Sequence, residues 1–399
     1  MSQALFVVNA GSSSIKFRLY RLSGQDLTPV FGGALDGIGT RPRLRVKTPG
    51  GAVLADHAFP ARDIGTAHQA QTAVADWVVA NLDGDEIVGV GHRVVHGGPI
   101  YSQPVRIDDD VLKTLRTFIP LAPLHQLSNL DPIEAIRERR PDLPQVACFD
   151  TAFHRGHPEI SDRFALPRAL YDEGVRRYGF HGLSYEYVSG ELRRVAPAIA
   201  RGNVVIAHLG SGASLCALRD GRSIETTMTF TALDGLPMGT RSGSLDPGIV
   251  LHLIEQRGMS AHDVGRMLYQ ESGLLGLSGI SNDVRDLLAS DRPEAAMAIE
   301  FFCLRVAQAV ASLATTLGGI DALVFTAGIG ENAGPVRQRI VERLGWCGLA
   351  LGPSVAVGSA QRIDGPGSRA AIFVIPTDEE QMIARHTLHL LGQGGTGVV

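Results

Sequence analysis

The sequence predicts an α/β protein built from two related domains. At 399 residues the chain exceeds the length at which a single hydrophobic core usually stops growing. Strand patterns alternate with helical spacing of apolar residues, which is typical of layered α/β architectures. A strand, a Gly/Ser-rich turn and a second strand occur at residues 6–20 and again at 203–218. This repetition indicates an internal duplication, and two unrelated hairpins are the alternative.

The first domain is rich in strand patterns. Helical spacing of Ala, Val, Trp and Leu predicts a helix at residues 67–82, and a shorter helix is expected at 132–139 after a segment rich in Pro, Leu and His. Apolar runs predict strands at residues 6–10, 15–20, 43–46, 87–92 and 145–150.

The second domain has clearer helix boundaries. A long apolar-periodic segment begins at Pro293 and is followed by Gly318 and Gly319, so a helix is expected at 293–317. A buried strand at 322–326 runs into the Gly-rich segment AGIGENAG, whose backbone N–H groups are suited to a nucleotide. A strand at 371–375 precedes PTDEEQMIARHTLHLL, a Pro–Thr–Asp helix start followed by a helix.

The composition favours a small-molecule ligand. With 44% hydrophobic and 20% charged residues and a net charge of -4, the chain has a soluble globular composition and no electrostatic reason to bind nucleic acid. The longest apolar stretch is too short and too polar to span a bilayer, and we find no signal peptide pattern. We therefore expect no membrane association and a cytoplasmic location. The separated cysteines Cys148, Cys216, Cys303 and Cys347 predict buried reduced thiols.

The opening stretch FVVNAGSSSIKFRLY has an unusually polar turn. Three serines and the following Lys16 offer more hydrogen bonds than a hairpin turn requires. A bound phosphate would use this surplus, although the phosphate-loop motif is absent because Lys16 falls on the second predicted strand. A decorated hairpin remains the alternative.

Two arginines lie in Gly-rich surroundings, Arg93 in GHRVVHGG and Arg241 in GLPMGTRSGSLDPG. A guanidinium presents a planar fork suited to carboxylate or phosphate, and surface salt bridging is the alternative. The neighbouring glycines would allow a ligand to approach the backbone closely.

Histidines also occur beside turns, at His125, His154, His181 and His208. Zinc binding is disfavoured because no H-E-x-x-H motif or nearby cysteine accompanies them. Hydrogen bonding to phosphoryl oxygens is the preferred interpretation, with satisfied core histidines as the alternative.

Two acidic features complete the candidate chemistry. Asp150 ends a predicted strand, and residues 378–380 form an acidic run at a helix start. Acidic residues there complement the helix dipole. A carboxylate facing the Asn9 turn would also suit the Mg²⁺ that accompanies ATP.

Seven motifs together closely resemble the acetate kinase family, from the first strand to the last helix: NAGSSSIKF, GHRVVHGG, FDTAFH, RYGFHGLSYEYV, GLPMGTRSG, AGIGENAG and IPTDEEQMIA. The resemblance implies duplicated actin-like (ribonuclease H-like) ATPase domains with a central cleft, and a homodimer. It implies an N-terminal domain at 1–150 completed by a C-terminal helix at 382–399, and a nucleotide-binding domain at 151–381. The implied reaction is reversible in-line transfer of the γ-phosphoryl group of ATP to acetate, with Mg²⁺ or Mn²⁺.

The resemblance also implies residue roles. Arg93 and Arg241 would hold the carboxylate and the phosphoryl group, His181 would stabilise the transition state with Arg241, Asp150 matches the essential aspartate, and His125 would contact the phosphoryl group. The acyl pocket would be formed by Val95, Leu124, Phe180 and the position of Ala232. Metal-associated residues would be Asn9 and Glu379. Nucleotide contacts are expected from Ser12, Ser14, Lys16, His208, Leu209, Gly210, Ser211, Gly212, Asp283, Val284, Arg285, Gly328, Ile329, Gly330, Glu331 and Asn332.

The chain departs from the family pattern at several positions. Ser211 replaces Asn, Gln126 replaces another Asn, Thr229 replaces Gly, and GSLDPG replaces the frequent G-D-x-D-P. Ala232 replaces Pro, which removes two ring carbons and would admit one extra methylene, so propionate is the alternative substrate. A sugar kinase, or a nucleotide-switching protein like actin or Hsp70, remains a further alternative, and dependence of ATP turnover on carboxylate would discriminate them.

Overall fold

The computed structural model describes residues 2–11, 14–24, 26–123, 125–353 and 359–393. The chain forms two compact units. Unit 1 comprises the residues up to Ala152 and those from Asp378 onward, and unit 2 is Phe153–Thr377.

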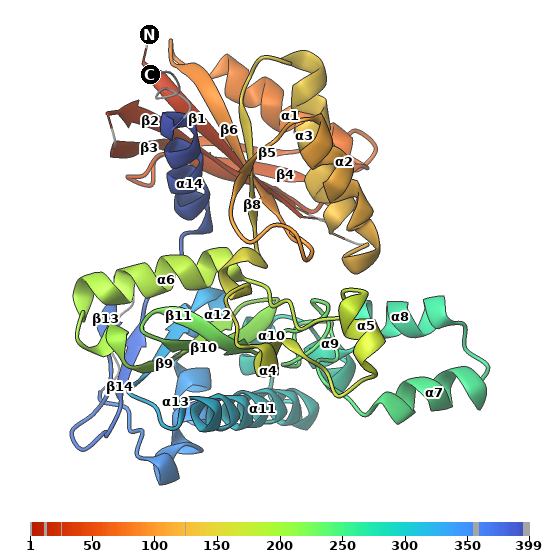
Figure 1. The fold of residues 1–399 in the computed structure, drawn as a ribbon, viewed down its shortest axis with the longest axis vertical. Coiled ribbons are helices and arrows are strands. Elements are labelled where there is room, and N and C mark those ends of the chain that lie inside the picture. The colour runs from red at the N-terminus through yellow and green to blue at the C-terminus, as the bar shows by residue number, and fades with distance from the viewer. Residues whose placement is uncertain (1, 12–13, 25, 124, 354–358, 394–399) are drawn as a thin grey trace. The chain divides into compact units, whose positions relative to one another are not determined.

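Unit 1 is built on an eight-stranded sheet of order β5-β4-β3-β2-β1-β6-β8-β7 (Figure 1). Its strands are β1 (Gln3–Ala10), β2 (Ser14–Ser23), β3 (Asp26–Asp36), β4 (Arg43–Lys47), β5 (Val53–Ala58), β6 (Glu86–Val94), β7 (Val105–Arg106) and β8 (Gln145–Phe149). Its helices are α1 (Ala67–Ala80), α2 (Asp109–Thr117), η1 (Ile119–Leu121), α3 (Gln126–Arg139) and α14 (Glu379–Gln393).

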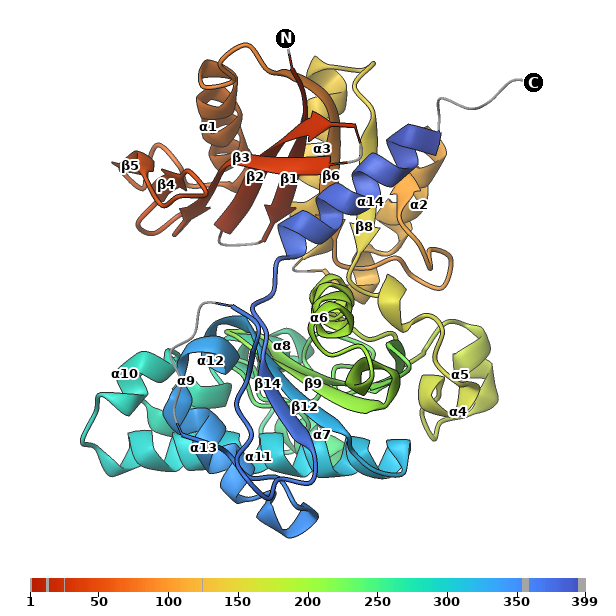
Figure 2. The same ribbon diagram turned by 90° about the vertical axis from the view of Figure 1, so that its left-hand side faces the viewer.

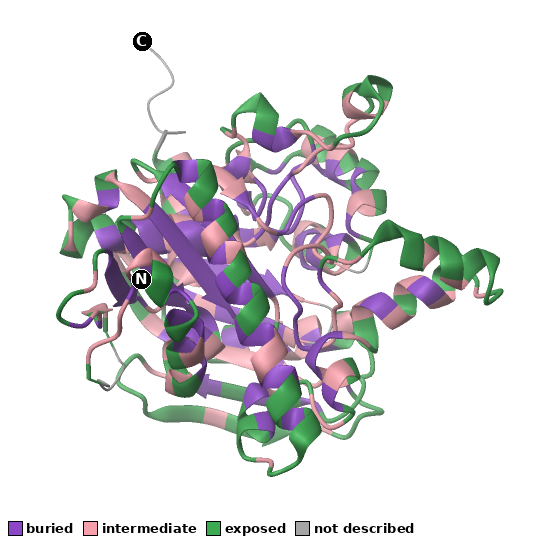
Figure 3. Ribbon diagram, turned by 90° about the horizontal axis from the view of Figure 1, so that it is seen from below, coloured by how far each residue is buried: buried purple, intermediate pink, exposed green. Residues whose placement is uncertain are grey.

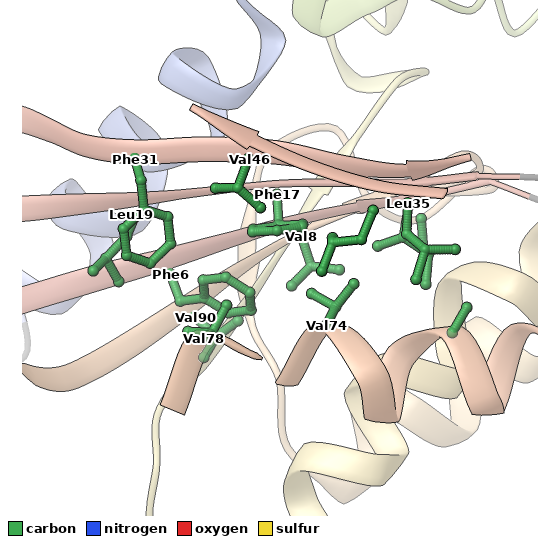
Figure 4. Packing of buried hydrophobic residues seen from close by; sticks show 14 of the residues in the cluster. Phe6, Val8, Phe17, Leu19, Phe31, Leu35, Val46, Val74, Val78 and Val90 are labelled. Atoms are coloured by element: carbon green, nitrogen blue, oxygen red, sulfur yellow. The ribbon is translucent and has the colours of Figure 1, made fainter. Parts of the chain in front are cut away.

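The two faces of this sheet are covered by different helices (Figure 2). Phe6 and Val8 of β1 and Val90 of β6 pack with Val74 and Val78 of α1 in one apolar core (Figure 4). Side chains alternate along a strand, so the intervening residues of β1 and β6 face the other way, toward α14.

Glycines on β6 allow α14 to approach the sheet. A Cβ on Gly91 would lie 2.3 Å from Thr387 Oγ1, and one on Gly89 would lie 2.4 Å from Leu391 Cδ1. Asn9 and Arg93 share the face of these glycines by their even spacing along the strands. The close packing therefore brings the first turn of α14 to the ends of β1 and β6.

Unit 2 is built on a six-stranded sheet of order β11-β10-β9-β12-β14-β13. Its strands are β9 (Asn203–Leu209), β10 (Ala213–Arg219), β11 (Arg222–Thr226), β12 (Ala322–Thr326), β13 (Gln361–Arg362) and β14 (Ala371–Val374). Its helices are η2 (Ala152–His154, beginning at the unit boundary), α4 (Glu159–Asp162), α5 (Arg168–Asp172), α6 (Gly182–Val195), η3 (Ile199–Arg201), α7 (Pro247–Glu255), α8 (Ala261–Gln270), α9 (Gly273–Ser278), α10 (Val284–Leu288), α11 (Pro293–Leu317), α12 (Ala327–Asn332), α13 (Gly334–Glu342) and η4 (Gly345–Cys347).

The two sheets repeat one topology. In unit 1, β3, β2 and β1 are antiparallel neighbours, and β6 and β8 continue in parallel from β1. In unit 2, β11, β10 and β9 are antiparallel, and β12 and β14 continue in parallel from β9. The repeated strand–turn–strand pattern thus marks the first hairpin of each sheet.

Helix α11 is the one described helix whose length and composition would allow it to cross a membrane. Its buried residues recur at helical spacing and include Phe302, Val306 and Val310, and it contacts β9 and β10. Burial is concentrated in the central strands of each sheet and on the inner faces of the helices that cover them (Figure 3). The apolar character of α11 is therefore that of a core helix.

Several predicted boundaries differ from the structure. The helix expected at 132–139 begins at Gln126, so Pro132 lies inside it and is buried there. The C-terminal helix begins at Glu379 rather than at 382. Pro293 begins α11 as predicted, and Gly318 ends it in a left-handed conformation with φ 78°. Cys148, Cys216 and Cys303 are buried as expected, whereas Cys347 is half-buried.

Candidate active site

A charged cluster lies at the ends of the central strands of unit 1. Arg93 Nε donates to Asp150 Oδ1 at 3.0 Å, and Arg93 Nη2 donates to Asp150 Oδ2 at 2.5 Å. Arg93 Nη1 donates to Asn9 Oδ1 at 3.4 Å. Asn9 Nδ2 donates to Glu379 Oε2 at 3.3 Å and to Glu380 Oε1 at 3.1 Å. The sequence-predicted residues Asn9, Arg93, Asp150 and Glu379 are therefore brought together.

The Arg93–Asp150 pair is well removed from solvent. The Asp150 side chain is 2% exposed and the Arg93 side chain 18%. Burial raises the pKa of the Asp150 carboxyl, although the Arg93 guanidinium opposes the rise. Burial opposes the charge of Arg93, but attraction to Asp150 outweighs it and raises the Arg93 pKa above its ordinary value. The guanidinium stays charged, and its bidentate partner fixes its plane.

Two buried side-chain amides support this cluster. Asn129 was not singled out from the sequence, and Gln126 was noted there only as a departure from the family pattern. Asn129 accepts from Val95 N at 2.8 Å and donates to Ala10 O at 2.5 Å, so it ties the ends of β1 and β6 together. Gln126 accepts from His96 N at 3.2 Å and donates to His96 O at 3.1 Å. A pair of amides spaced three residues apart in a helix, as in QLSN, was the available signal.

A network of imidazoles and hydroxyls occupies the corresponding part of unit 2. The rings of His181 and His208 are stacked with centroids 4.1 Å apart. His181 Nδ1 lies 2.8 Å from Ser214 Oγ, and His208 Nδ1 lies 2.8 Å from Ser184 Oγ. Ser184 Oγ also lies 2.8 Å from Thr377 Oγ1. Each imidazole is thus oriented by a hydroxyl.

Arg241 joins this network through the turn at Gly212. A Cβ on Gly212 would lie 3.4 Å from His181 Nε2 and 3.7 Å from Arg241 Nη1, so the two side chains converge beside this glycine. Gly239 N donates to Ser211 O at 3.1 Å, which joins the two loops. Arg241 Nη1 donates to Ala232 O at 2.9 Å.

The other residues assigned to the nucleotide have varied surroundings. Asp283 caps α10 and pairs with the exposed Arg285, whose hydrogen bond lowers the Asp283 pKa. Val284 is buried in the core. The Gly-rich segment forms the short helix α12, and Glu331 accepts from Thr377 N at 3.1 Å. Gly328 and Asn332 are exposed, Gly330 is buried and Ile329 is half-buried.

The remaining predicted residues divide between the units. In unit 1, Val95 is buried, Lys16 is exposed and pairs with Asn9 in the β1–β2 ladder, Ser14 begins β2, and the half-buried His125 precedes α3. In unit 2, Phe180 and Leu209 are buried and Ala232 is half-buried, while Gly210 and Gly212 border the hairpin turn. Ser12 and Leu124 lie outside the described residues.

Two interpretations from the sequence are corrected. His154 lies in a buried network, with Nε2 2.8 Å from Phe180 O and Nδ1 2.8 Å from Ser223 Oγ, so the core alternative holds for it. The glycines beside the arginines serve internal packing, because a Cβ on Gly98 would lie 2.5 Å from the Phe118 ring and one on Gly243 would lie 2.5 Å from the Leu236 backbone.

The donor chemistry at Asn9 is compatible with a divalent cation. Glu379 and Glu380 present carboxylate oxygens to the amide of Asn9 at the start of α14. Mg²⁺ bound with a triphosphate usually takes only one or two protein carboxylates. These residues therefore fit a metal that accompanies a nucleotide.

The family model of the acetokinase family matches residues 4–385. An acetate kinase of Rhizobium meliloti is 55% identical over 97% of this chain and 98% of its own, and one of Nitrobacter hamburgensis is 53% identical over 97% and 96%. Among solved structures, a propionate kinase from Francisella tularensis aligns with TM-score 0.88 and 38% identity, covering 98% of this chain and all of its own. Porphyromonas gingivalis acetate kinase aligns with TM-score 0.84 and 33% identity over 98% and 100%.

The repeated sheets and these structural neighbours define a protein of the duplicated actin-like ATPase class, and the predicted fold class is confirmed. The chain belongs to the acetokinase family, as the sequence motifs predicted.

Proposed function

We propose that this chain is an acetate kinase that transfers the γ-phosphoryl group of ATP to acetate, giving acetyl phosphate and ADP in a reversible reaction. The observation that carries the proposal is its relationship, over nearly the full length, to named acetate kinases. The paired Arg93 and the Arg241–His181 group support it, because they supply donors for two anionic reactants.

The reaction requires no general base. Acetate has a pKa of roughly 4–5, like a side-chain carboxyl, and is ionised at neutral pH. Both carboxylate oxygens of Asp150 accept hydrogen bonds from Arg93. This supports a role for Asp150 in orienting that guanidinium rather than in accepting a proton. Arg93 would then hold an anionic oxygen with its remaining donors.

In unit 2, Arg241 and His181 would stabilise charge on the transferring phosphoryl group. Both converge beside Gly212, where the missing side chain leaves space for a ligand. Positioned donors of this kind account for most of the catalysis in phosphoryl transfer, because the chemistry needs alignment and charge neutralisation. His125 and the hairpin residue Lys16 remain predicted phosphate contacts.

We assign the metal to Asn9 and Glu379, with Glu380 as their neighbour. Bound Mg²⁺ or Mn²⁺ would neutralise phosphate charge. Nucleotide contacts are assigned to Ser12, Ser14, Lys16, His208–Gly212, Asp283–Arg285 and Gly328–Asn332. A cytoplasmic location remains a prediction. So does the homodimer, which is supported by the exposed apolar residues Ile249, Leu251 and Ile254 of α7.

Propionate is the second candidate substrate. It is favoured by the similarity to the Francisella propionate kinase and by Ala232 in the proposed acyl pocket. The deciding experiment measures initial rates with ATP, Mg²⁺ and formate, acetate, propionate or butyrate, with the acyl phosphate trapped as a hydroxamate. A maximum at acetate supports the proposal, one at propionate changes the substrate, and turnover without carboxylate dependence overturns both.

A further inference from the structure

Thr229 connects two segments of unit 2 that carry proposed active-site residues. It is 2% exposed and was noted in the sequence as a departure from the family pattern. Its carbonyl oxygen accepts from Gly179 N at 3.2 Å, next to Phe180 and His181. Its hydroxyl donates to Asp234 Oδ2. Through its carbonyl oxygen and its hydroxyl, Thr229 thus joins residues 179–181 to the loop 229–244.

Asp234 in turn holds both ends of that loop. Its Oδ1 accepts from Ser244 Oγ at 2.6 Å and from Gly235 N at 2.8 Å. Ser244 N donates to Gly235 O at 2.9 Å. Hydrogen bonds to a carboxylate are stronger than those between neutral groups. Ser244, the Ser of the divergent GSLDPG segment, is therefore part of the same cluster as Thr229.

The clamped loop determines where Arg241 points. Arg241 Nη1 donates to Ala232 O at 2.9 Å, and Ala232 lies between Thr229 and Asp234 in the sequence. Gly243 has φ 70°, and a Cβ there would lie 2.5 Å from the Leu236 backbone, so the loop has no space in which to shift at this point.

We propose that Thr229, acting through Asp234, is a positioning residue that fixes the Arg241 guanidinium and the Ala232 wall of the acyl pocket. The inference rests on the proposed function, in which Arg241 contacts the reactants and Ala232 limits the acyl chain. Thr229 touches neither reactant in this scheme. Its hydroxyl would set both the rate and the preference between acetate and propionate.

The consequence of losing the hydroxyl follows from the geometry. Thr229→Val keeps the side-chain shape but leaves Asp234 Oδ2 without this donor, so the Thr229 end of the loop loosens. Displacing a positioned group by about 1 Å costs up to about 10²-fold in rate. We expect kcat with acetate to fall about tenfold, the KM for ATP to change less than about twofold, and the propionate-to-acetate ratio of kcat/KM to rise severalfold.

The experiment compares Thr229→Val, Thr229→Ser, Asp234→Asn and the Thr229→Val/Asp234→Asn double variant in the hydroxamate assay with both acids. Thermal unfolding is recorded for each. Thr229→Ser should recover most of the rate and the wild-type ratio. The double variant should cost little more than Asp234→Asn alone, because Thr229 acts through Asp234, which also accepts from Ser244 and Gly235. Ser242→Ala is the matched control, since this hydroxyl of the same loop donates to Gly243 O at 3.0 Å.

Several results would contradict the positioning role of Thr229. A Thr229→Val enzyme with wild-type kcat and acid preference removes the inference while leaving the proposed function intact. Thr229→Ser as defective as Thr229→Val, or additive effects in the double variant, also removes it. If Thr229→Val does not fold, the rate and acid preference of Asp234→Asn decide. Wild-type enzyme without carboxylate-dependent turnover overturns the proposed function and the inference together.

Discussion

The central strands of the two units end beneath the first turn of a covering helix, but they present different chemistry there. In unit 1, Asn9 and Arg93 lie beside Glu379 of α14. In unit 2, His208, which pairs with Thr326 of the next strand, lies beside Ser184 of α6. Asn9 and His208 are each the penultimate residue of the first parallel strand of their sheet.

This difference shows that the repeated fold supplies positions while the side chains supply the chemistry. A buried charge must be paired, and unit 1 meets this need with the bidentate Arg93–Asp150 pair. In unit 2 the imidazoles of His181 and His208 are oriented by neutral hydroxyls. The candidate site residues of unit 1 are therefore organised around an ion pair, and those of unit 2 around hydrogen bonds with Arg241 as the charged group at Gly212.

The largest expected effect comes from removing that charge from unit 2. Arg241→Ala should lower kcat by about two to three powers of ten, because losing one positioned donor to a developing charge typically costs this much. Steady-state kinetics with acetate and ATP provide the measurement. A kcat within about threefold of wild type would exclude Arg241 from the transition state.

The matched control is Arg266→Ala, which removes an exposed guanidinium of the same unit that pairs with Glu271 and Asp263. Exposed ion pairs contribute little to stability, so kcat and the midpoint of unfolding should both stay close to wild type.

In unit 1, Asp150→Asn tests whether the ion pair orients Arg93. We expect kcat to fall by about one to two powers of ten, because Asn replaces one of the two acceptor oxygens with an NH2 donor, and the two-point contact that fixes the plane of the Arg93 guanidinium is lost. The pH profile of kcat should keep its shape. A new or shifted limb in that profile would instead identify Asp150 as a proton acceptor.

The same unit contains a second bidentate pair for comparison. Arg21 Nε donates to Asp85 Oδ1 at 2.9 Å, and Arg21 Nη2 donates to Asp85 Oδ2 at 2.8 Å. Asp85→Asn should lower the free energy of unfolding and leave kcat unchanged. Equal losses of activity in both variants would show that Asp150 matters only for folding.

The regular elements were predictable where apolar spacing was strong. The hairpins of both sheets and helix α11 were expected with nearly correct bounds. Strand β5 was missed because five of its six residues, among them Val53 and His57, are exposed and leave no alternating pattern. The start of α3 was misplaced because the buried Pro132 lies inside the helix rather than at its first position. Local sequence patterns do not predict the bounds of an element where packing against other elements determines them.

The candidate site was predictable as a set of motifs but not as a geometry. The motifs identified Arg93, Asp150 and Asn9 without showing that Arg93 contacts both of the others. Contacts across more than 300 residues, such as Asn9 with Glu379, depend on how α14 packs on the β6 glycines. No local pattern contains that information.

We also expect low pH to destabilise the two units to different extents. Burial lowers the pKa of His92 in unit 1 and of His154 in unit 2 from 6.5 to about 4, and burial with the nearby His154 and Arg155 lowers the pKa of His157. The unfolded chain then binds more protons below pH 6.5, so stability is lost as the pH falls from about 6.5 toward 4.

His92 and His154 each contribute a loss of about 2 kcal/mol at pH 5, and His157 adds to the loss in unit 2. Hydrogen exchange at pH 6.5 and 5 should show the greater loss of protection in unit 2. His157→Gln should reduce that excess. Equal losses in the two units, or an excess unaffected by His157→Gln, would contradict this assignment.

The smallest expected effect concerns acid preference. Ala232→Val adds two methyl carbons to a half-buried position of unit 2 while leaving its carbonyl oxygen, which accepts from Arg241, in the backbone. A methylene in an apolar pocket is worth about 1–3 kcal/mol, so kcat/KM for propionate should fall about tenfold relative to acetate. Ala232→Ser, with nearly unchanged volume, is the control and should leave the ratio unchanged. If the ratio stays constant in both variants, position 232 does not line the acyl pocket, and acid preference is determined elsewhere in the chain.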